Sequence, residues 1–203
     1  MPIPKPKRIP ALDLHRFLDA AKDIFDTPDE TATREVFVFV SAVRSSGFDE
    51  AVAKLPIRID PSLPPLELVD AIAAALSAHA GGGKQEILCK SLQEAILESS
   101  GLDYDLGALD PRSRLSNFLR QNGSSSFMEL FLSIYLFNLI WIQIQEAVRW
   151  SLKDENSFRA FMESFSRACR NVVKAALAEQ AGAQKDIRQV MTDIQRSLLP
   201  LER

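Results

Sequence analysis

Three glycines followed by a lysine, at residues 81–84, form the first segment of this sequence that could carry out chemistry, because glycine-rich loops can wrap around phosphate groups. A phosphate-binding loop of this class also needs a glycine five residues before the last one, a serine or threonine after the lysine, and a strand leading in. Here Ala78 and Gln85 occupy the first two places, and a helix is expected before the glycines. The segment therefore predicts a flexible connection between two helices.

Three aspartates around Gly107, namely Asp103, Asp105 and Asp110, resemble a carboxylate loop for a hard cation. The calcium-loop pattern requires an oxygen ligand at its fifth position and a glutamate at its twelfth. Gly107 and Arg114 stand at those positions, so we interpret the aspartates as turn and helix-cap residues. The sequence predicts no metal site and no cofactor.

The histidines and cysteines do not form a catalytic pattern. His15 and His79 each stand alone among helical residues, so neither has the spacing of a zinc site. Cys89 and Cys169 lie in apolar helical patterns, where a free thiol usually behaves as a small buried hydrophobic group. A pair of Cys89 and His79 could assemble in space, but nothing local activates the thiol. We therefore expect no enzyme, with an active site built from dispersed residues as the residual alternative.

Asn138 stands alone among the apolar and aromatic residues at positions 134–142. Burying an unpaired amide costs about 1–3 kcal/mol, so this side chain should have a partner. One interpretation is a satisfied core amide that fixes helix register; the other is a face that is exposed in the monomer and pairs with another chain. Aromatic side chains anchor many interfaces, although at helical spacing they are more often core. The interface candidates are Tyr135, Asn138, Trp141 and Trp150.

Basic residues gather on one side of the helix expected over residues 156–179, opposite a phenylalanine stripe. Residues spaced by three and four can share one helix face, and Glu163 interrupts this one. One interpretation is a solvated face; the other is a contact to phosphates or to an acidic partner, which would weaken steeply with salt. The basic-face candidates are Arg149, Lys153, Arg159, Arg167, Arg170 and Lys174, with Lys5, Lys7 and Arg8 near the N-terminus.

The elements that must position these residues centre on sixteen uncharged residues, Leu130 to Gln145. A membrane-spanning helix needs roughly 20 predominantly apolar residues, and this run contains Ser133, Asn138 and two glutamines. We therefore expect a buried central helix at 127–152, with the helix at 156–179 as its antiparallel neighbour. No secretory leader pattern is visible at the N-terminus, so we expect a cytoplasmic protein.

Helix boundaries in this half of the chain are marked by capping patterns. Asp110 is an N-cap residue with proline at the next position, and the helix that it starts should end at Gly123. Ser126 and Glu129 match the capping box that opens many helices. Asp154 or Asn156 can cap the next helix. Earlier helices are expected over residues 66–79 and 84–99.

Prolines divide the N-terminal part of the chain. Residues 1–10 alternate prolines with basic side chains and predict a flexible arm. Residues 11–55 read as an N-terminal helical layer or subdomain, in which 35–43 could be a short strand but is more consistent with helix. The proline-rich connector at 56–65 cannot continue a helix, and 66–203 form the main bundle. The predicted fold is all-α, a multi-helix bundle around a long central apolar helix.

The composition excludes some classes of function but does not identify the function. The chain has 203 residues, of which 46% are hydrophobic and 25% charged, and a net charge of −3, which is too small for a surface-wide nucleic-acid footprint. We expect a non-catalytic interaction subunit or adaptor that has a protein partner or self-associates. The alternatives are an accessory subunit of a nucleic-acid-binding complex and a membrane-active protein that releases its apolar helix, although we do not expect a membrane partner.

Overall fold

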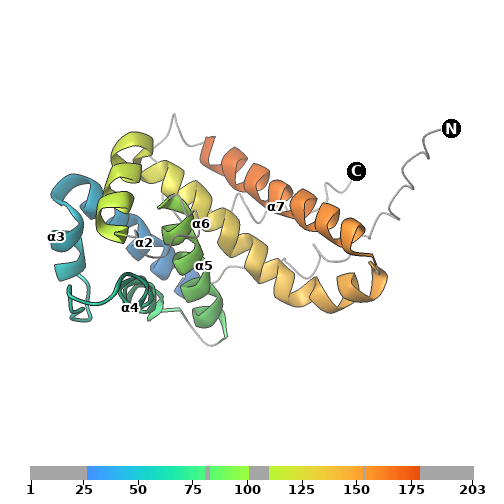
Figure 1. Ribbon diagram of the computed structural model, residues 1–203, viewed down its shortest axis with the longest axis horizontal. Helices are drawn as coiled ribbons and strands as arrows, with labels where there is room; N and C mark the ends of the chain where they lie inside the picture. The colour runs from blue at the N-terminus through green and yellow to red at the C-terminus, as the bar shows by residue number, and fades with distance from the viewer. Residues whose placement is uncertain (1–26, 81–82, 101–109, 153, 179–203) are drawn as a thin grey trace.

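The computed structural model describes residues 27–80, 83–100, 110–152 and 154–178, and Figure 1 shows how their helices are arranged. The described helices are α2 (Thr27–Ser46), α3 (Phe48–Ala53), α4 (Pro65–Ser77), α5 (Lys84–Ser99), α6 (Pro111–Ser151) and α7 (Glu155–Ala178). These described ranges contain no strand, which confirms the predicted all-α fold.

The central position of α6 confirms the expected long apolar helix at the middle of the bundle. α6 packs against α2, α3 and α5, and its second half runs antiparallel to α7 (Figure 1). Phe127, Phe131 and Tyr135 are among the largest fully buried side chains. Burying one such side chain contributes roughly 1.5–3 kcal/mol, so this part of α6 contributes substantially to the stability of the bundle.

Residues 35–43 lie inside α2, so the strand alternative for this segment is wrong and the helical interpretation is confirmed. Their β-branched and aromatic side chains favour a strand when taken one at a time. Their spacing decides otherwise, because Val36, Val40 and Val43 recur at intervals of four and three and are all buried. Phe37 and Val38 lie outside this buried stripe and are exposed.

A glycine and a proline-rich segment set the breaks in the N-terminal half. Gly47 has φ +99°, a conformation that glycine adopts readily and other residues rarely do, and it turns the chain from α2 into α3. Residues 54–64 then connect α3 to α4 without helix, as the prolines predicted. The buried side chains of α2 and α3 belong to the same hydrophobic core as those of α4, α5, α6 and α7.

The start of α6 confirms one capping prediction and corrects another. Asp110 accepts hydrogen bonds from the backbone N–H groups of Arg112 at 3.1 Å and Ser113 at 3.3 Å. Gly123 has φ 81° and ψ 165° and breaks the helical path where a break was expected. The capping box at Ser126 is wrong, because this hydroxyl donates to the carbonyl oxygen of Asn122 at 2.7 Å. The chain re-enters the helix directly after Gly123, so Ser126 already lies inside the helix.

The turn between α6 and α7 produces the antiparallel pair that the sequence predicted (Figure 1). Asp154 is the residue that caps α7, and its carboxylate accepts the backbone N–H of Ser157 at 2.8 Å. The phenylalanine stripe of α7 faces α6, where the ring centroids of Phe137 and Phe165 lie 5.0 Å apart.

Some predictions concern residues outside the described ranges. They are the arm at 1–10 with Lys5, Lys7 and Arg8, the residues His15, Asp103, Asp105, Gly107 and Lys153, the glycines at 81–82, and the chain beyond residue 178.

Candidate functional site

The side of α6 that is buried in the bundle continues past the bundle as an exposed surface. Seven residues are close to two helical turns, so Tyr135, Ile142 and Arg149 lie on nearly the same side of the helix. Tyr135 is fully buried, whereas Ile142 is 53% exposed. The same change occurs between Leu139, which is buried, and Glu146, which is exposed. The side of α6 that carries Tyr135 and Leu139 thus becomes exposed from Ile142 onwards, past the helices that cover it.

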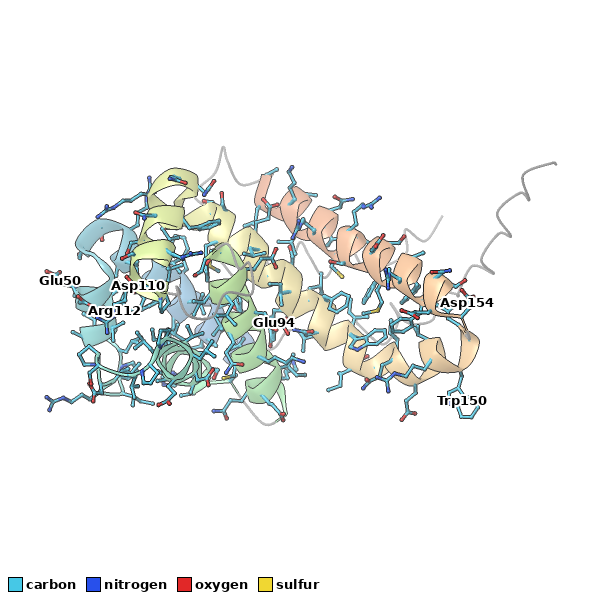
Figure 2. All side chains as sticks on the ribbon, viewed as in Figure 1. Glu50, Glu94, Asp110, Arg112, Trp150 and Asp154 are labelled. Carbon is cyan, nitrogen blue, oxygen red and sulfur yellow. The ribbon has the colours of Figure 1, made fainter. Side chains whose placement is uncertain are left out.

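We call this region the α6 end surface and define it by four residues, Ile142, Glu146, Arg149 and Trp150. Trp150 is 81% exposed and lies on the side of α6 that faces away from α7 (Figure 2). Within the described ranges, neither Glu146 nor Arg149 forms an ion pair or a side-chain hydrogen bond. The surface therefore combines two exposed apolar side chains with one free charge of each sign.

The four interface candidates from the sequence do not share this surface. Tyr135 is in the core, and Trp141 is half-buried against Phe137 and Phe158. Asn138 is half-buried and has partners within the chain, because its side-chain amide donates to Ser91 Oγ at 3.0 Å and to Glu94 Oε2 at 3.3 Å. The structure thus brings Tyr135, Asn138 and Trp141 into intramolecular packing and leaves only Trp150 on the surface.

The described basic-face candidates occupy two separate places. Arg149 lies in the last turn of α6, whereas Arg167, Arg170 and Lys174 lie on the exposed side of the second half of α7. Arg170 contacts Glu98 of α5 with an N–O distance of 3.5 Å. Closer to the start of α7, Arg159 pairs with Glu155 at 3.2 Å, and both of these side chains are exposed. The basic face is therefore partly neutralised, and Arg149 does not extend it.

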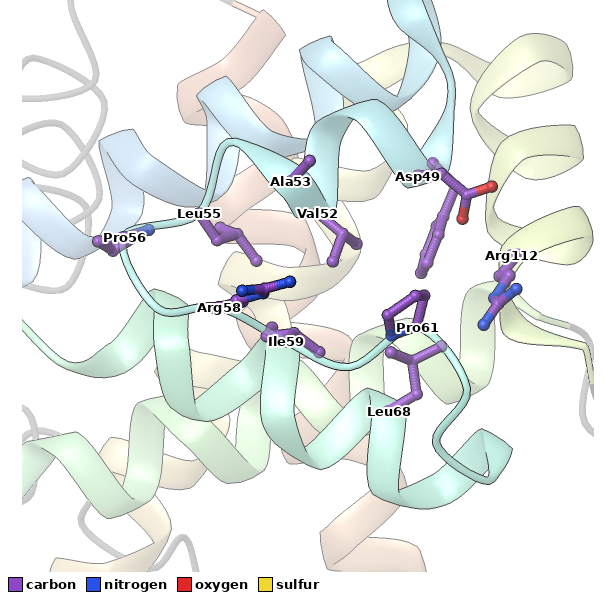
Figure 3. Close-up of a pocket in the computed structure, with 11 residues that line it drawn as sticks. Asp49, Val52, Ala53, Leu55, Pro56, Arg58, Ile59, Pro61, Leu68 and Arg112 are labelled. Atoms are coloured by element: carbon purple, nitrogen blue, oxygen red, sulfur yellow. The ribbon is translucent and has the colours of Figure 1, made fainter.

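A pocket of about 760 Å³ opens between α3, the connector at 54–64 and α4 (Figure 3). Its walls are mostly apolar, and it also has charged side chains from α3, the connector and α6, namely Asp49, Arg58 and Arg112. Beside the pocket, hydrogen bonds from Ser62 lower the pKa of Asp60 and a hydrogen bond from Ser113 lowers the pKa of Asp110, with smaller contributions from Arg58 and Arg112. The pocket lining therefore carries charges of both signs, and no ligand class follows from them.

No protein-family model matches this chain, and it has no match among curated proteins or solved structures. Its function must therefore be inferred from its own surfaces. Two of them stand out by exposure and chemistry, the α6 end surface and the basic second half of α7.

The thiols are not activated. Burial raises the pKa of Cys169 to about 12, and burial is also the largest cause that raises the pKa of Cys89, partly offset by the neighbouring Ser77 hydroxyl. His79 does not orient Cys89, because its Nδ1 lies 2.9 Å from a carboxylate oxygen of Glu35 on α2. The described part of the chain also contains no group of three or more His, Cys, Asp or Glu residues that could hold a metal ion.

Among the described helices, α6 is long and apolar enough to cross a membrane by length and composition. A core helix passes the same test, and 56% of the apolar window is buried inside the protein. An inserted state would require residues such as Phe131 and Tyr135 to leave the core. Leakage of dye-filled vesicles would detect that state.

Sequence reasoning missed Ile142 and Glu146 as surface residues. The signal was present in the seven-residue spacing from Tyr135 to Ile142 and from Leu139 to Glu146. That spacing predicts which residues share a side of the helix. It does not predict where along the helix the covering neighbours end.

Proposed function

We propose that this protein is a helical, non-catalytic interaction subunit or adaptor that binds a protein partner through the α6 end surface. The observation that carries the proposal is the exposure of Trp150, at 81%, beside Ile142, at 53%, on a helix side that is buried closer to the bundle. Exposed apolar groups that continue a core stripe favour a binding surface over a solvated one. The free thiols of Cys89 and Cys169 are compatible with the cytoplasmic location that we also propose.

The energetics of such a contact centre on Trp150. A tryptophan buries about 150–250 Å² in an interface, and each Å² of apolar surface contributes about 25 cal/mol before the costs of association are subtracted. Tryptophan and arginine are also enriched among the few residues that carry most of the binding energy. We therefore expect Trp150 to be the anchor and Arg149 to restrict the partner's orientation.

The experiment is a tagged pull-down at near-native expression, with and without nuclease, that compares the wild-type chain with Trp150→Ala. Protein partners that survive nuclease and are lost from Trp150→Ala would support the proposal. Phe37→Ala is the matched control, because it removes an aromatic ring that is 41% exposed on a different helix, and it should retain the partners. Equal recovery from the wild-type chain and Trp150→Ala would contradict the proposal.

A second candidate function, an accessory subunit of a nucleic-acid-binding complex, is favoured by the second half of α7. Arg167 and Lys174 have no ion-pair partner among the described residues, and no acidic residue follows Glu163 within α7. Such a face would bind phosphates with an affinity that falls as salt rises. The test is binding to a mixed-sequence duplex across a salt series. Arg167→Glu with Lys174→Glu should abolish binding. Unchanged binding would show that this face is not the nucleic-acid-binding surface.

A further inference from the structure

We propose that the partner at the α6 end surface is a second copy of this chain, packed antiparallel about a two-fold axis that passes beside Glu146. This inference rests on the proposed function, because it names the partner of the same surface. It would make the protein a homodimer whose contact is formed by the ends of two α6 helices.

The positions of the two apolar side chains carry the first step. In an antiparallel, two-fold symmetric helix pair, a residue that precedes the axis by a given number of positions faces the residue that follows it by the same number. Ile142 lies four positions before Glu146, and Trp150 lies four positions after it. Ile142 of each copy therefore faces Trp150 of the other copy, and the contact forms twice.

The charges carry the second step. The two copies of Glu146 flank the axis, and Arg149 is long enough to reach Glu146 of the other copy, so each carboxylate gains a guanidinium. Among the described residues, neither side chain has an ion-pair partner that would have to be released first. The surface carries one charge of each sign, so two copies attract at these positions. A strongly acidic or strongly basic partner would leave one of the two charges unpaired.

The shape of the molecule carries the third step. Residues 142–151 extend over about 15 Å of helix, and α7 covers the side of α6 opposite to Trp150 (Figure 2). Two such hairpins placed side by side would give a four-helix arrangement, in which each α7 lies on the outer side of its own α6. The contact is smaller than the roughly 800 Å² per partner of a standard interface, so we expect weak, reversible association.

The experiment is sedimentation velocity of the full chain from micromolar to millimolar concentration. We expect a monomer–dimer equilibrium that Trp150→Ala weakens by roughly 30-fold or more, since this ring enters the contact twice. Phe37→Ala should leave the equilibrium unchanged. Circular dichroism checks that each variant is folded, and no variant at the α6 end surface removes a fully buried side chain.

A charge swap separates self-association from binding to another protein. Glu146→Arg alone places only positive charge on the surface, and Arg149→Glu alone places only negative charge, so each should abolish the dimer. The double variant Glu146→Arg with Arg149→Glu should restore it, because both copies carry the swapped pair. A different partner would not be restored by the double variant, because its own charges stay unchanged.

The outcomes are distinguishable. A monomer at all concentrations, together with pull-down partners that Trp150→Ala loses, would overturn this inference and keep the proposed function. A dimer that persists in Trp150→Ala and in both single charge variants would also overturn it, because the contact would lie elsewhere. If every one of these variants kept both the dimer and the pull-down partners, both proposals would be overturned.

Discussion

The side-chain amide of Asn138 on α6 donates a hydrogen bond to the hydroxyl oxygen of Ser91 on α5 at 3.0 Å. Ser91 Oγ in turn donates to the carbonyl oxygen of Ile87 at 2.8 Å, and the same amide lies 3.3 Å from a carboxylate oxygen of Glu94. A half-buried amide within an apolar helix is thus satisfied across the helix pair. The bonds form only when α5 and α6 meet in one register, so Asn138 specifies that register.

Replacing this amide by a carboxylate should make stability depend on pH. Asn138→Asp removes the N–H donors and places a second negative charge beside Glu94, which raises the pKa of the introduced group in the folded state. A raised folded-state pKa means that stability is intact below the unfolded pKa of about 3.9 and is lost as pH rises through the folded pKa. We expect a loss of about 1–3 kcal/mol at neutral pH and little loss in acid, measured by urea unfolding.

The control for that variant is a second substitution of its neighbour. Glu94→Gln in the Asn138→Asp background removes the repulsion and should recover part of the stability at neutral pH. Equal losses in acid and at neutral pH would show that the negative charge is not the cause.

The N-cap of α6 should contribute stability that disappears in acid. Hydrogen bonds lower the pKa of Asp110, with the Ser113 hydroxyl as the largest cause and the backbone N–H groups adding to it. A lowered folded-state pKa means that the stabilisation is present above the unfolded pKa of about 3.9 and is lost as pH falls through the folded pKa. Asp110→Ala should cost about 1 kcal/mol at neutral pH, as measured by urea unfolding.

Asp110→Asn keeps an acceptor oxygen for the cap and removes the charge. It should therefore retain most of the stability at neutral pH. The decrease in its free energy of unfolding at acid pH should be smaller than in the wild-type chain. If the pH dependence of stability were the same in Asp110→Asn as in the wild-type chain, the acid sensitivity would arise from other carboxyl groups.

The break in α6 should resist substitution by any residue with a side chain. Gly123 has φ 81°, and an added Cβ would meet no atom within 4 Å, so only the backbone conformation opposes alanine there. Gly123→Ala should cost about 1–3 kcal/mol in thermal or urea unfolding. Gly83 is the matched control, because it has equally open surroundings but φ −64°, and Gly83→Ala should be neutral or stabilising by up to about 1 kcal/mol. Equal effects at the two sites would contradict this account.

The two thiols should differ in reactivity. Cys169 is 3% exposed with a pKa raised to about 12 by burial, whereas Cys89 is only half-buried. A small alkylating reagent should modify Cys89 first, and Cys169 at a rate that follows unfolding, as mass spectrometry can measure. The Cys169 thiol has a pKa of about 8.5 in the unfolded chain and a higher pKa in the folded protein. The free energy of unfolding should therefore fall as pH rises from about 8.5 towards the folded-state pKa. If both thiols were modified at the same rate in the native protein, the burial of Cys169 would be contradicted.

Features that depend on a few neighbouring residues could be predicted from the sequence. The caps at Asp110 and Asp154 and the break at Gly123 follow from local chemistry, and each is found where it was expected. The capping box at Ser126 failed although it is also local, because a four-residue pattern does not include the re-entry of the helix directly after Gly123.

Features that depend on which helices meet could be predicted only in part. The spacing of the apolar residues in α2 predicted a helix with one buried side, although its valines taken one at a time favour a strand. Tyr135 and Ile142 have the same place on the helix wheel and similar apolar character, yet one is buried and the other is half exposed. The difference arises from the length of the neighbouring helices, which no pattern within α6 contains.

The order of the helices along the chain also has a consequence for how fast the protein folds. Among the described helices, α4, α5 and α6 each pack against the next helix in the sequence, and α2 packs against α3. α2 also packs against α6, which begins far later in the chain. Closing a short loop costs less entropy than closing a long one, and proteins rich in local contacts fold within microseconds to milliseconds. We therefore expect the three successive helix pairs from α4 to α7 to form early and α2 to dock onto α6 last. The rate of folding would then be set by the N-terminal half of the chain, although the C-terminal half contains the central helix.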